Sequence, residues 1–225
     1  YEHPDNWSEY SSNMHAEHYD LLFDGPHFVD CRINNINHSV LIKLPQLFRW
    51  QLITRKDDTT ITKVKDMIGK NVCAPGSPNF GMLSMFSHFP DPDKQPQHVK
   101  IKGWINVYEA VVAGKCDVGV LPKTNLAIYD KDGEHTKIIH THLPYPNQGF
   151  TSGKRISPEL REIIRTKLLS PEGQNALTNL RKRYGAGALM INADNEEYDG
   201  VRFVLQRADN FKFKKNKNLP LVSNQ

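Results

Sequence analysis

Residues 70–86 read KNVCAPGSPNFGMLSMF, and residues 104–121 read WINVYEAVVAGKCDVGVL. Each contains an apolar run of strand length beside a segment whose apolar residues recur every three or four positions, the spacing of a helix. Pro75 and Pro78 mark a turn in the first stretch, and Gly114 ends the helix of the second. With another strand predicted over residues 99–103, the order is β-α-β-α-β, which predicts a parallel sheet covered by helices.

The flanking segments predict a second unit of the same class. An apolar run at residues 20–23 is predicted to be a buried strand, and residues 40–54 form a long β-rich stretch interrupted by Pro45. Residues 129–142 are expected to be a loop. The last third is predicted to be helical, because Ser-Pro-Glu helix starts occur at residues 157–159 and 170–172.

Two α/β units joined by long crossing segments predict two lobes. We expect residues 1–52 to form the first part of lobe one and residues 53–122 to form lobe two. Residues 123–225 would then supply the return crossing and the rest of lobe one. Ligands of such folds bind beyond the carboxyl ends of parallel strands.

Composition excludes several classes of protein. The chain has 225 residues, of which 38% are hydrophobic and 24% charged. No apolar run approaches the roughly 20 residues that cross a bilayer, and collagen-like or coiled-coil repeats are absent from the sequence. The net charge is +4. Much of the excess falls in one segment, which indicates a solvated basic tail rather than a nucleic-acid-binding face: Lys212, Lys214, Lys215 and Lys217.

The three cysteines, Cys31, Cys73 and Cys116, are far apart and lack metal-finger spacing. An odd number leaves at least one unpaired, and we expect buried structural thiols. The cysteine pattern does not decide the compartment.

Five motifs in series resemble one known family, the phosphate/phosphite/phosphonate-binding branch of the type 2 periplasmic solute-binding proteins of ABC transporters. The resemblance covers about residues 5 to 205. The motifs are DLLFDGPH at 20–27, residues 55–69 followed by KNVCAPGS at 70–77, YEAVVAGKCDVGV at 108–120, PYPN at 144–147 and ISPEL at 156–160.

The resemblance implies a two-lobed periplasmic-binding-protein-like α/β fold, each lobe a parallel-rich sheet flanked by helices, that closes on a ligand without catalysis. It implies a small-molecule ligand and an ABC permease as partners, with no nucleic acid and no membrane-spanning segment. The protein would work in the periplasm or another extracytoplasmic space, where a removed leader could tether it to the membrane. From the family layout we expect the first strand and helix of lobe one to be missing ahead of Tyr1, either because the native protein has residues that this chain lacks or because lobe one is incomplete and leans on a partner.

Candidate ligand-binding residues lie at strand ends and helix starts. Asp24 and His27 flank a Gly-Pro turn, and each is a candidate ligand contact. The alternative is a structural role, with Asp24 as a turn cap and His27 as a half-buried residue at the start of a helix. Ser77 and Asn79 could donate to ligand oxygens while also capping a helix. Trp104 could line the pocket.

Two further candidates come from other segments. Tyr108 either lines the pocket or belongs to the core of its lobe. Asn147 lies with Tyr145 on the return crossing, where both are candidate hinge residues.

Three departures from the family pattern affect the expected ligand. Ser77-Pro78-Asn79 replaces a hydroxyl cluster, and Pro78 lacks an N–H donor. Trp104 and Ile105 stand where the family has His-Asp. Asp24 would repel an anion unless the ligand also carries a cation. These departures argue against a simple phosphonate and leave a small polar or anionic solute.

Metal and enzyme sites are not predicted. His135, His140 and His142 are close in sequence, but spacings of five and two do not place them on one helix face, so a surface loop is expected. Asp57 and Asp58 are adjacent in a turn and would point apart. The sequence has no P-loop, Rossmann, GxSxG or HExxH motif, and no cofactor is expected.

The sequence therefore predicts an extracytoplasmic solute-binding protein for an ABC importer and not an enzyme. The alternative is a ligand-sensing or accessory periplasmic module of a signalling protein or larger assembly. A weaker third hypothesis is a solute-binding fold recruited to catalysis.

Overall fold

The computed structural model describes residues 7–206. The basic tail predicted at residues 212–217 lies outside the described residues. Among those described, no helix is both long and apolar enough to cross a membrane.

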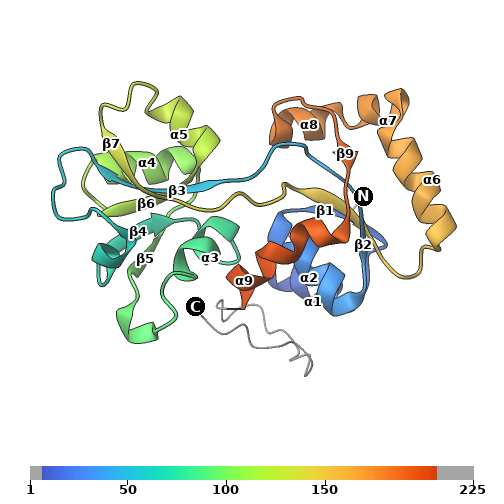
Figure 1. Cartoon of the computed structure of the whole chain (residues 1–225), viewed down its shortest axis with the longest axis horizontal. Helices are drawn as coiled ribbons and strands as arrows, with labels where there is room; N and C mark the ends of the chain where they lie inside the picture. The colour runs from blue at the N-terminus through green and yellow to red at the C-terminus, as the bar shows by residue number, and fades with distance from the viewer. Residues whose placement is uncertain (1–6, 207–225) are drawn as a thin grey trace.

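Two sheets form two lobes, on opposite sides of Figure 1. The sheet of the first lobe has the order β1 (Leu21–Asp24), β8 (Gly149–Ser152), β2 (Ser39–Lys43), β9 (Ile191–Asn192). The sheet of the second lobe has the order β5 (Gln97–Lys100), β4 (Asn71–Ala74), β6 (Val118–Pro122), β3 (Trp50–Arg55), β7 (Thr136–Thr141).

Helices surround both sheets, which confirms the two-lobed α/β fold (Figure 1). The first lobe carries α1 (Trp7–His15), α2 (Pro26–Ile36), α6 (Pro158–Leu169), α7 (Pro171–Ala176), α8 (Thr178–Gly185), the 3-10 helix η3 (Asn195–Val201) and α9 (Arg202–Leu205). The second lobe carries the 3-10 helices η1 (Val64–Met67) and η2 (Pro92–Lys94), and α3 (Phe80–Phe86), α4 (Trp104–Val112) and α5 (Lys123–Tyr129).

Strand directions correct one part of the expected fold. In the second lobe β4 is parallel to β5 and β6, as predicted, whereas β3 and β7 are antiparallel additions. In the first lobe the described pairs β1–β8, β2–β8 and β2–β9 are all antiparallel, so the expectation of a parallel-rich sheet is wrong there. The reason is that β8, entering from the return crossing, lies between β1 and β2 and runs against both.

The predicted loop at residues 129–142 is also wrong, because it contains the edge strand β7. Ile138 of β7 pairs with Ile53 of β3. Ile138 is itself 51% exposed, and the polar pairs Thr136-Lys137 and His140-Thr141 on either side of Ile138-Ile139 hide the strand pattern. The strands of the second sheet thus come from residues 50–141.

Cys73 and Cys116 form a disulfide, which corrects the expectation of unpaired thiols. They are 43 residues apart in sequence, but their Cα atoms are 5.8 Å apart. Parallel pairing of β4 with β6 brings them together, since Cys73 lies opposite Gly119. Cys31 is free and buried, as expected for at least one of the three. A structural disulfide fits an oxidising compartment.

Two crossing segments join the lobes and pair with each other. Phe48 and Tyr145 exchange backbone hydrogen bonds of 2.8 and 2.9 Å, and the N–H of Leu44 donates to the carbonyl of Gln148 at 3.0 Å. The largest cluster of buried apolar residues includes Val29 from α2 as well as the strands of the second lobe. The lobes therefore share a packed apolar contact beside the crossing ribbon.

Candidate functional site

The loop between β4 and α3 lies at the carboxyl ends of the parallel strands β4 and β5. Lys100, the last residue of β5, extends its side chain over this loop, so that a Cβ added at Gly76 would be 2.7 Å from Lys100 Cε. Lys100 is exposed and forms no ion pair within the described part of the chain. Glycine at 76 thus lets a cationic side chain lie directly against the loop that contains Ser77.

Asn79 serves as the N-cap of α3. Its side-chain oxygen accepts hydrogen bonds from the N–H groups of Gly81 at 3.0 Å and Met82 at 3.3 Å. The capping role predicted for Asn79 is confirmed. Because these N–H groups are already bonded, a ligand anion would need other donors on this side. Ser77, exposed in the same loop, precedes a cis peptide bond to Pro78.

An aromatic wall of three rings packs against α3 in the second lobe. Trp104 begins α4, and its ring centroid lies 5.2 Å from that of Trp50 at the start of β3. The ring of Phe48 lies 5.0 Å from that of Trp50 on its other side. A Cβ at Gly81 would be 2.6 Å from the Trp50 ring, so glycine allows Trp50 to pack closely on α3. Trp50 is buried and Trp104 is half-buried, which leaves Trp104 as the accessible ring of the pair.

His27 lies at the contact between the lobes. Its ring stacks on that of Phe80, with centroids 5.3 Å apart, and the Phe80 ring lies 5.0 Å from that of Tyr145 on the return crossing. Burial, and to a smaller extent the nearby Arg32 charge, lowers the pKa of His27 to about 3, while a hydrogen bond with the backbone of Pro78 acts in the opposite direction. His27 is therefore a neutral imidazole at neutral pH and interacts with the second lobe.

Asp24 takes part in a network inside the first lobe. Its carboxylate accepts hydrogen bonds from Tyr10 Oη and from Arg32 Nη1, the latter at 2.6 Å. Arg32 also donates from Nε to Thr151 Oγ1 at 2.8 Å, and its side chain is fully buried whereas that of Asp24 is 18% exposed. The negative charge of Asp24 thus balances a buried guanidinium.

The last two predicted site residues lie in packed surroundings. Asn147 is buried; its side-chain oxygen accepts from the N–H of Gln148 at 2.8 Å, and its carbonyl accepts from Tyr198 Oη at 2.8 Å. Tyr108 is buried in an apolar cluster of the second lobe, with its ring 5.9 Å from that of Tyr129. Of the predicted site residues, Ser77 and Asn79 belong to the loop that Lys100 contacts, Trp104 begins α4 four residues beyond Lys100, and His27 lies at the lobe contact.

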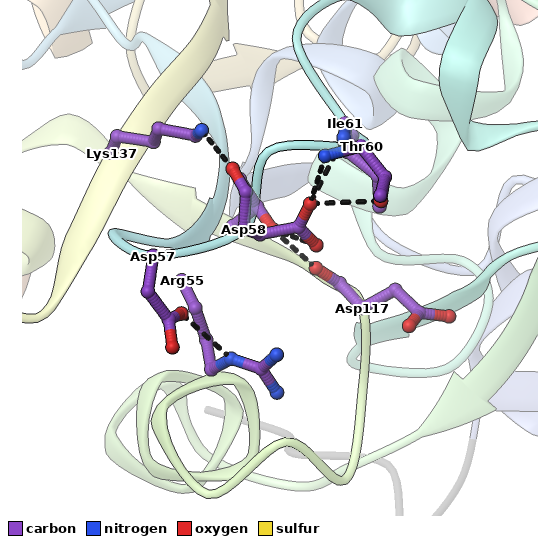
Figure 2. A network of polar contacts seen from close by, with 8 residues as sticks. Arg55, Asp57, Asp58, Thr60, Ile61, Asp117 and Lys137 are labelled. Carbon is purple, nitrogen blue, oxygen red and sulfur yellow. Dashed lines mark hydrogen bonds and ion pairs between the residues drawn. The ribbon is translucent and has the colours of Figure 1, made fainter.

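The adjacent acids Asp57 and Asp58 do point apart, as predicted (Figure 2). Asp57 accepts from Arg55 Nε at 3.1 Å, whereas one oxygen of Asp58 accepts from the N–H groups of Thr60 and Ile61 at 2.7 and 3.0 Å. Burial opposes ionisation, but these hydrogen bonds prevail and lower the pKa of Asp58. The Asp58 carbonyl in turn accepts from Lys137 (Figure 2). This pair organises the turn after β3.

A family model described as "ABC transporter, phosphonate, periplasmic substrate-binding protein" matches residues 1–198. The chain belongs to this family. Its members are the periplasmic solute-binding proteins of ABC importers. The family assignment agrees with the two-lobed fold and with the disulfide of the second lobe.

Solved structures with the same fold include XAC2383 from Xanthomonas citri bound to ATP, with a TM-score of 0.70, 15% identity, and coverage of 90% of this chain and 84% of that one. Another is PhnD1 from Prochlorococcus marinus in complex with methylphosphonate, with a TM-score of 0.63, 11% identity, and coverage of 91% and 84%. A third is a binding protein component of a phosphonate ABC transporter from Pseudomonas aeruginosa, with a TM-score of 0.62, 14% identity, and coverage of 91% and 74%. No curated protein matches the chain.

Sequence reasoning missed Lys100 and Trp50. Lys100 lies inside the strand predicted over residues 99–103, whereas β5 runs from Gln97 to Lys100, so its position at the strand end was hidden. Trp50 lies within the β-rich stretch predicted over residues 40–54, where nothing local marks it as the first residue of β3. The parallel pairing of β4 with β5 is the signal that could have located Lys100 at a strand end. In that pairing Lys100 lies opposite Ala74, the last residue of β4.

Proposed function

We propose that this solute-binding protein captures a small oxyanion that carries an organic group and delivers it to an ABC importer. The observation that carries the proposal is Lys100, which lies against the Gly76 loop and has no ion-pair partner in the described part of the chain, with the half-buried Trp104 four residues further along the chain. A cation and an accessible aromatic face suit the two ends of such a solute.

The arrangement of charges supports an anion over a cationic solute. Asp24, the acid that would repel an anion, is bonded to Arg32 and so presents little net charge toward the loop. His27, held neutral by burial, adds neither attraction nor repulsion. Of these three groups, Lys100 is the one whose charge would act on a ligand at the loop.

The aromatic wall supports an organic group on that anion. Where the family pattern has a hydroxyl cluster, Ser77 is followed by Pro78 and by Asn79, whose side-chain oxygen is occupied as a cap. The loop therefore offers an anion fewer hydrogen-bond donors than the family pattern does. The apolar surface of Trp104 would compensate by packing against an organic group of the ligand. The family name and the ligand of the Prochlorococcus protein make phosphonates the first class to test.

Thermal unfolding of the purified protein tests the ligand class. The panel holds phosphate, phosphite, alkyl- and arylphosphonates, alkyl- and arylsulfonates, and matched amines without an acid group. We expect at least one organic oxyanion to raise the melting temperature, since a ligand bound only to the folded state stabilises it. Stabilisation by amines alone, or by nothing in the panel, would contradict the proposal.

No observation favours the sensing or accessory module, and the residues that would support catalysis organise turns and buried networks instead. We infer that the chain binds and releases its solute unchanged. Incubation of the stabilising solute with excess protein, followed by mass spectrometry, should recover it intact.

A further inference from the structure

Three histidines from separate parts of the second lobe converge outside the solute site. His88 follows the end of α3, His140 lies in β7 and His142 follows that strand. Their ring centroids are 4.7 to 4.9 Å apart. One nitrogen from each ring lies within 4.8 Å of the others.

The fold explains the convergence. His140 and His142 are two residues apart on an extended segment, so their side chains lie on the same face. The N–H of His142 donates to the carbonyl of Trp50 at 2.9 Å, which extends the pairing with β3 beyond β7. The turn that ends α3, where the N–H of His88 donates to the carbonyl of Met85 at 3.2 Å, places His88 over the other two. His135, the third histidine of the sequence cluster, is not part of this group.

The spacing of the nitrogens suits one metal ion. His88 Nε2 and His142 Nδ1 are 3.4 Å apart. Two nitrogens that each lie about 2.0–2.1 Å from a tetrahedral Zn²⁺ are separated by about 3.4 Å. Hydrogen bonding accounts for only part of the group: His88 Nε2 and His142 Nδ1 are within hydrogen-bond distance, whereas the second nitrogen of His142, Nε2, is buried without a hydrogen-bond partner in the described part of the chain.

Imidazole rings bind metals as neutral ligands, through the lone pair of a ring nitrogen. His88 is exposed, His140 half-buried and His142 buried, so an ion could enter from solvent and keep an open coordination position.

We propose that His88, His140 and His142 bind one divalent transition-metal ion of the Zn²⁺, Co²⁺ or Ni²⁺ class. A set of three imidazoles favours these ions over Mg²⁺ and Ca²⁺, which prefer oxygen ligands. The bound ion would join the end of α3 to the return crossing. None of the three histidines belongs to β5 or to the loop between β4 and α3.

Isothermal titration of tag-free, chelator-stripped protein with Zn²⁺ and Ni²⁺ tests the proposal, with Mg²⁺ as the comparison ion. We expect one Zn²⁺ per chain and no binding of Mg²⁺. His88→Gln and His140→Gln should each weaken Zn²⁺ binding at least about tenfold, the loss that even an outer-shell change can cause. His135→Gln, the matched control, and Lys100→Gln should bind Zn²⁺ as the unchanged protein does.

His142 is buried and its replacement could unfold the lobe, so the decisive variants are those at the exposed His88 and half-buried His140. Visible absorption of the Co²⁺-loaded protein provides a second measurement, because tetrahedral coordination gives intense bands that His88→Gln should remove. Failure of the unchanged protein to bind Zn²⁺ would overturn the proposal. Equal binding by the unchanged protein, His88→Gln and His140→Gln would also overturn it, since the ion would then be held elsewhere.

Discussion

The imidazole of His27 stacks on the phenyl ring of Phe80, with 5.3 Å between centroids and 2° between the ring planes. His27 lies in the first turn of α2 in one lobe, and Phe80 begins α3 in the other. The contact therefore joins the two lobes at the edge of the proposed solute site. It also requires a neutral histidine in an apolar setting, which makes stability depend on pH.

We predict that the protein loses stability as the pH falls below about 6.5. Burial, aided by Arg32, lowers the pKa of His27 to about 3 and that of His38 to about 4. In the unfolded chain both titrate near the ordinary value of about 6.5. At pH values between the folded and the unfolded pKa, the unfolded state binds protons that the folded state does not. The free energy of unfolding therefore rises with pH in this range and decreases on acidification.

Urea unfolding at pH 7, 6 and 5 measures this dependence. Each histidine contributes up to about 1.4 kcal/mol per pH unit in the steep part of its range. His27→Gln should reduce the slope by up to that amount, whatever its effect at pH 7. Equal slopes for His27→Gln and the unchanged protein would show that His27 is not held neutral.

Asp24→Asn should destabilise the first lobe strongly. The substitution removes the charge that balances the fully buried Arg32, and breaking a buried ion pair costs about 3–5 kcal/mol. Equilibrium urea unfolding would measure the loss. Asp20→Asn is the matched control, because Asp20 pairs with Arg155 at 2.7 Å but both side chains are more than half exposed. The control should change stability very little; a similarly small effect of Asp24→Asn would contradict the structural role of Asp24.

Reduction of the disulfide should destabilise the second lobe. Cys73 and Cys116 close a loop with a sequence separation of 43 residues. The chain-entropy account gives such a cross-link about 4 kcal/mol of stabilisation. We expect dithiothreitol and the double substitution Cys73→Ala/Cys116→Ala to lower the free energy of unfolding by similar amounts. Dithiothreitol should not change the free energy of unfolding of the double variant. If it does, the effect of dithiothreitol on the unchanged protein does not come from this disulfide alone.

The periodic segments of the sequence predicted most of the second lobe. The strand and helix patterns from Lys70 to Leu121 depend on near neighbours in sequence, and the structure has β4, α3, α4 and β6 in that order. Short elements of mixed polarity were missed. β8 spans only Gly149–Ser152, and β7 reads TKIIHT, with polar pairs at both ends and no alternation, so neither has a clear local pattern.

The site could be predicted only in part, because partners distant in sequence define it. Asn79 as a helix cap is a local feature and was predicted. Asp24 was expected at a turn, but its main partner, Arg32, is on the next helix, and Thr151 completes the network from a strand 119 residues away from Arg32. His88 lies 54 residues before His142, so no spacing rule could join them.

Titration calorimetry of Lys100→Gln tests the central claim most directly. The titrant is the organic oxyanion that most stabilises the unchanged protein. Lys115→Gln is the matched control, because Lys115 is exposed and lies away from the Gly76 loop. Its neighbour Asp117 donates a backbone hydrogen bond to the carbonyl of Asn71, which is at the opposite end of β4 from that loop. A charge-assisted hydrogen bond is worth about 1.5–3 kcal/mol, so we predict a loss of affinity of at least about tenfold for Lys100→Gln and none for Lys115→Gln. Unchanged affinity in Lys100→Gln would contradict an oxyanion site at this loop.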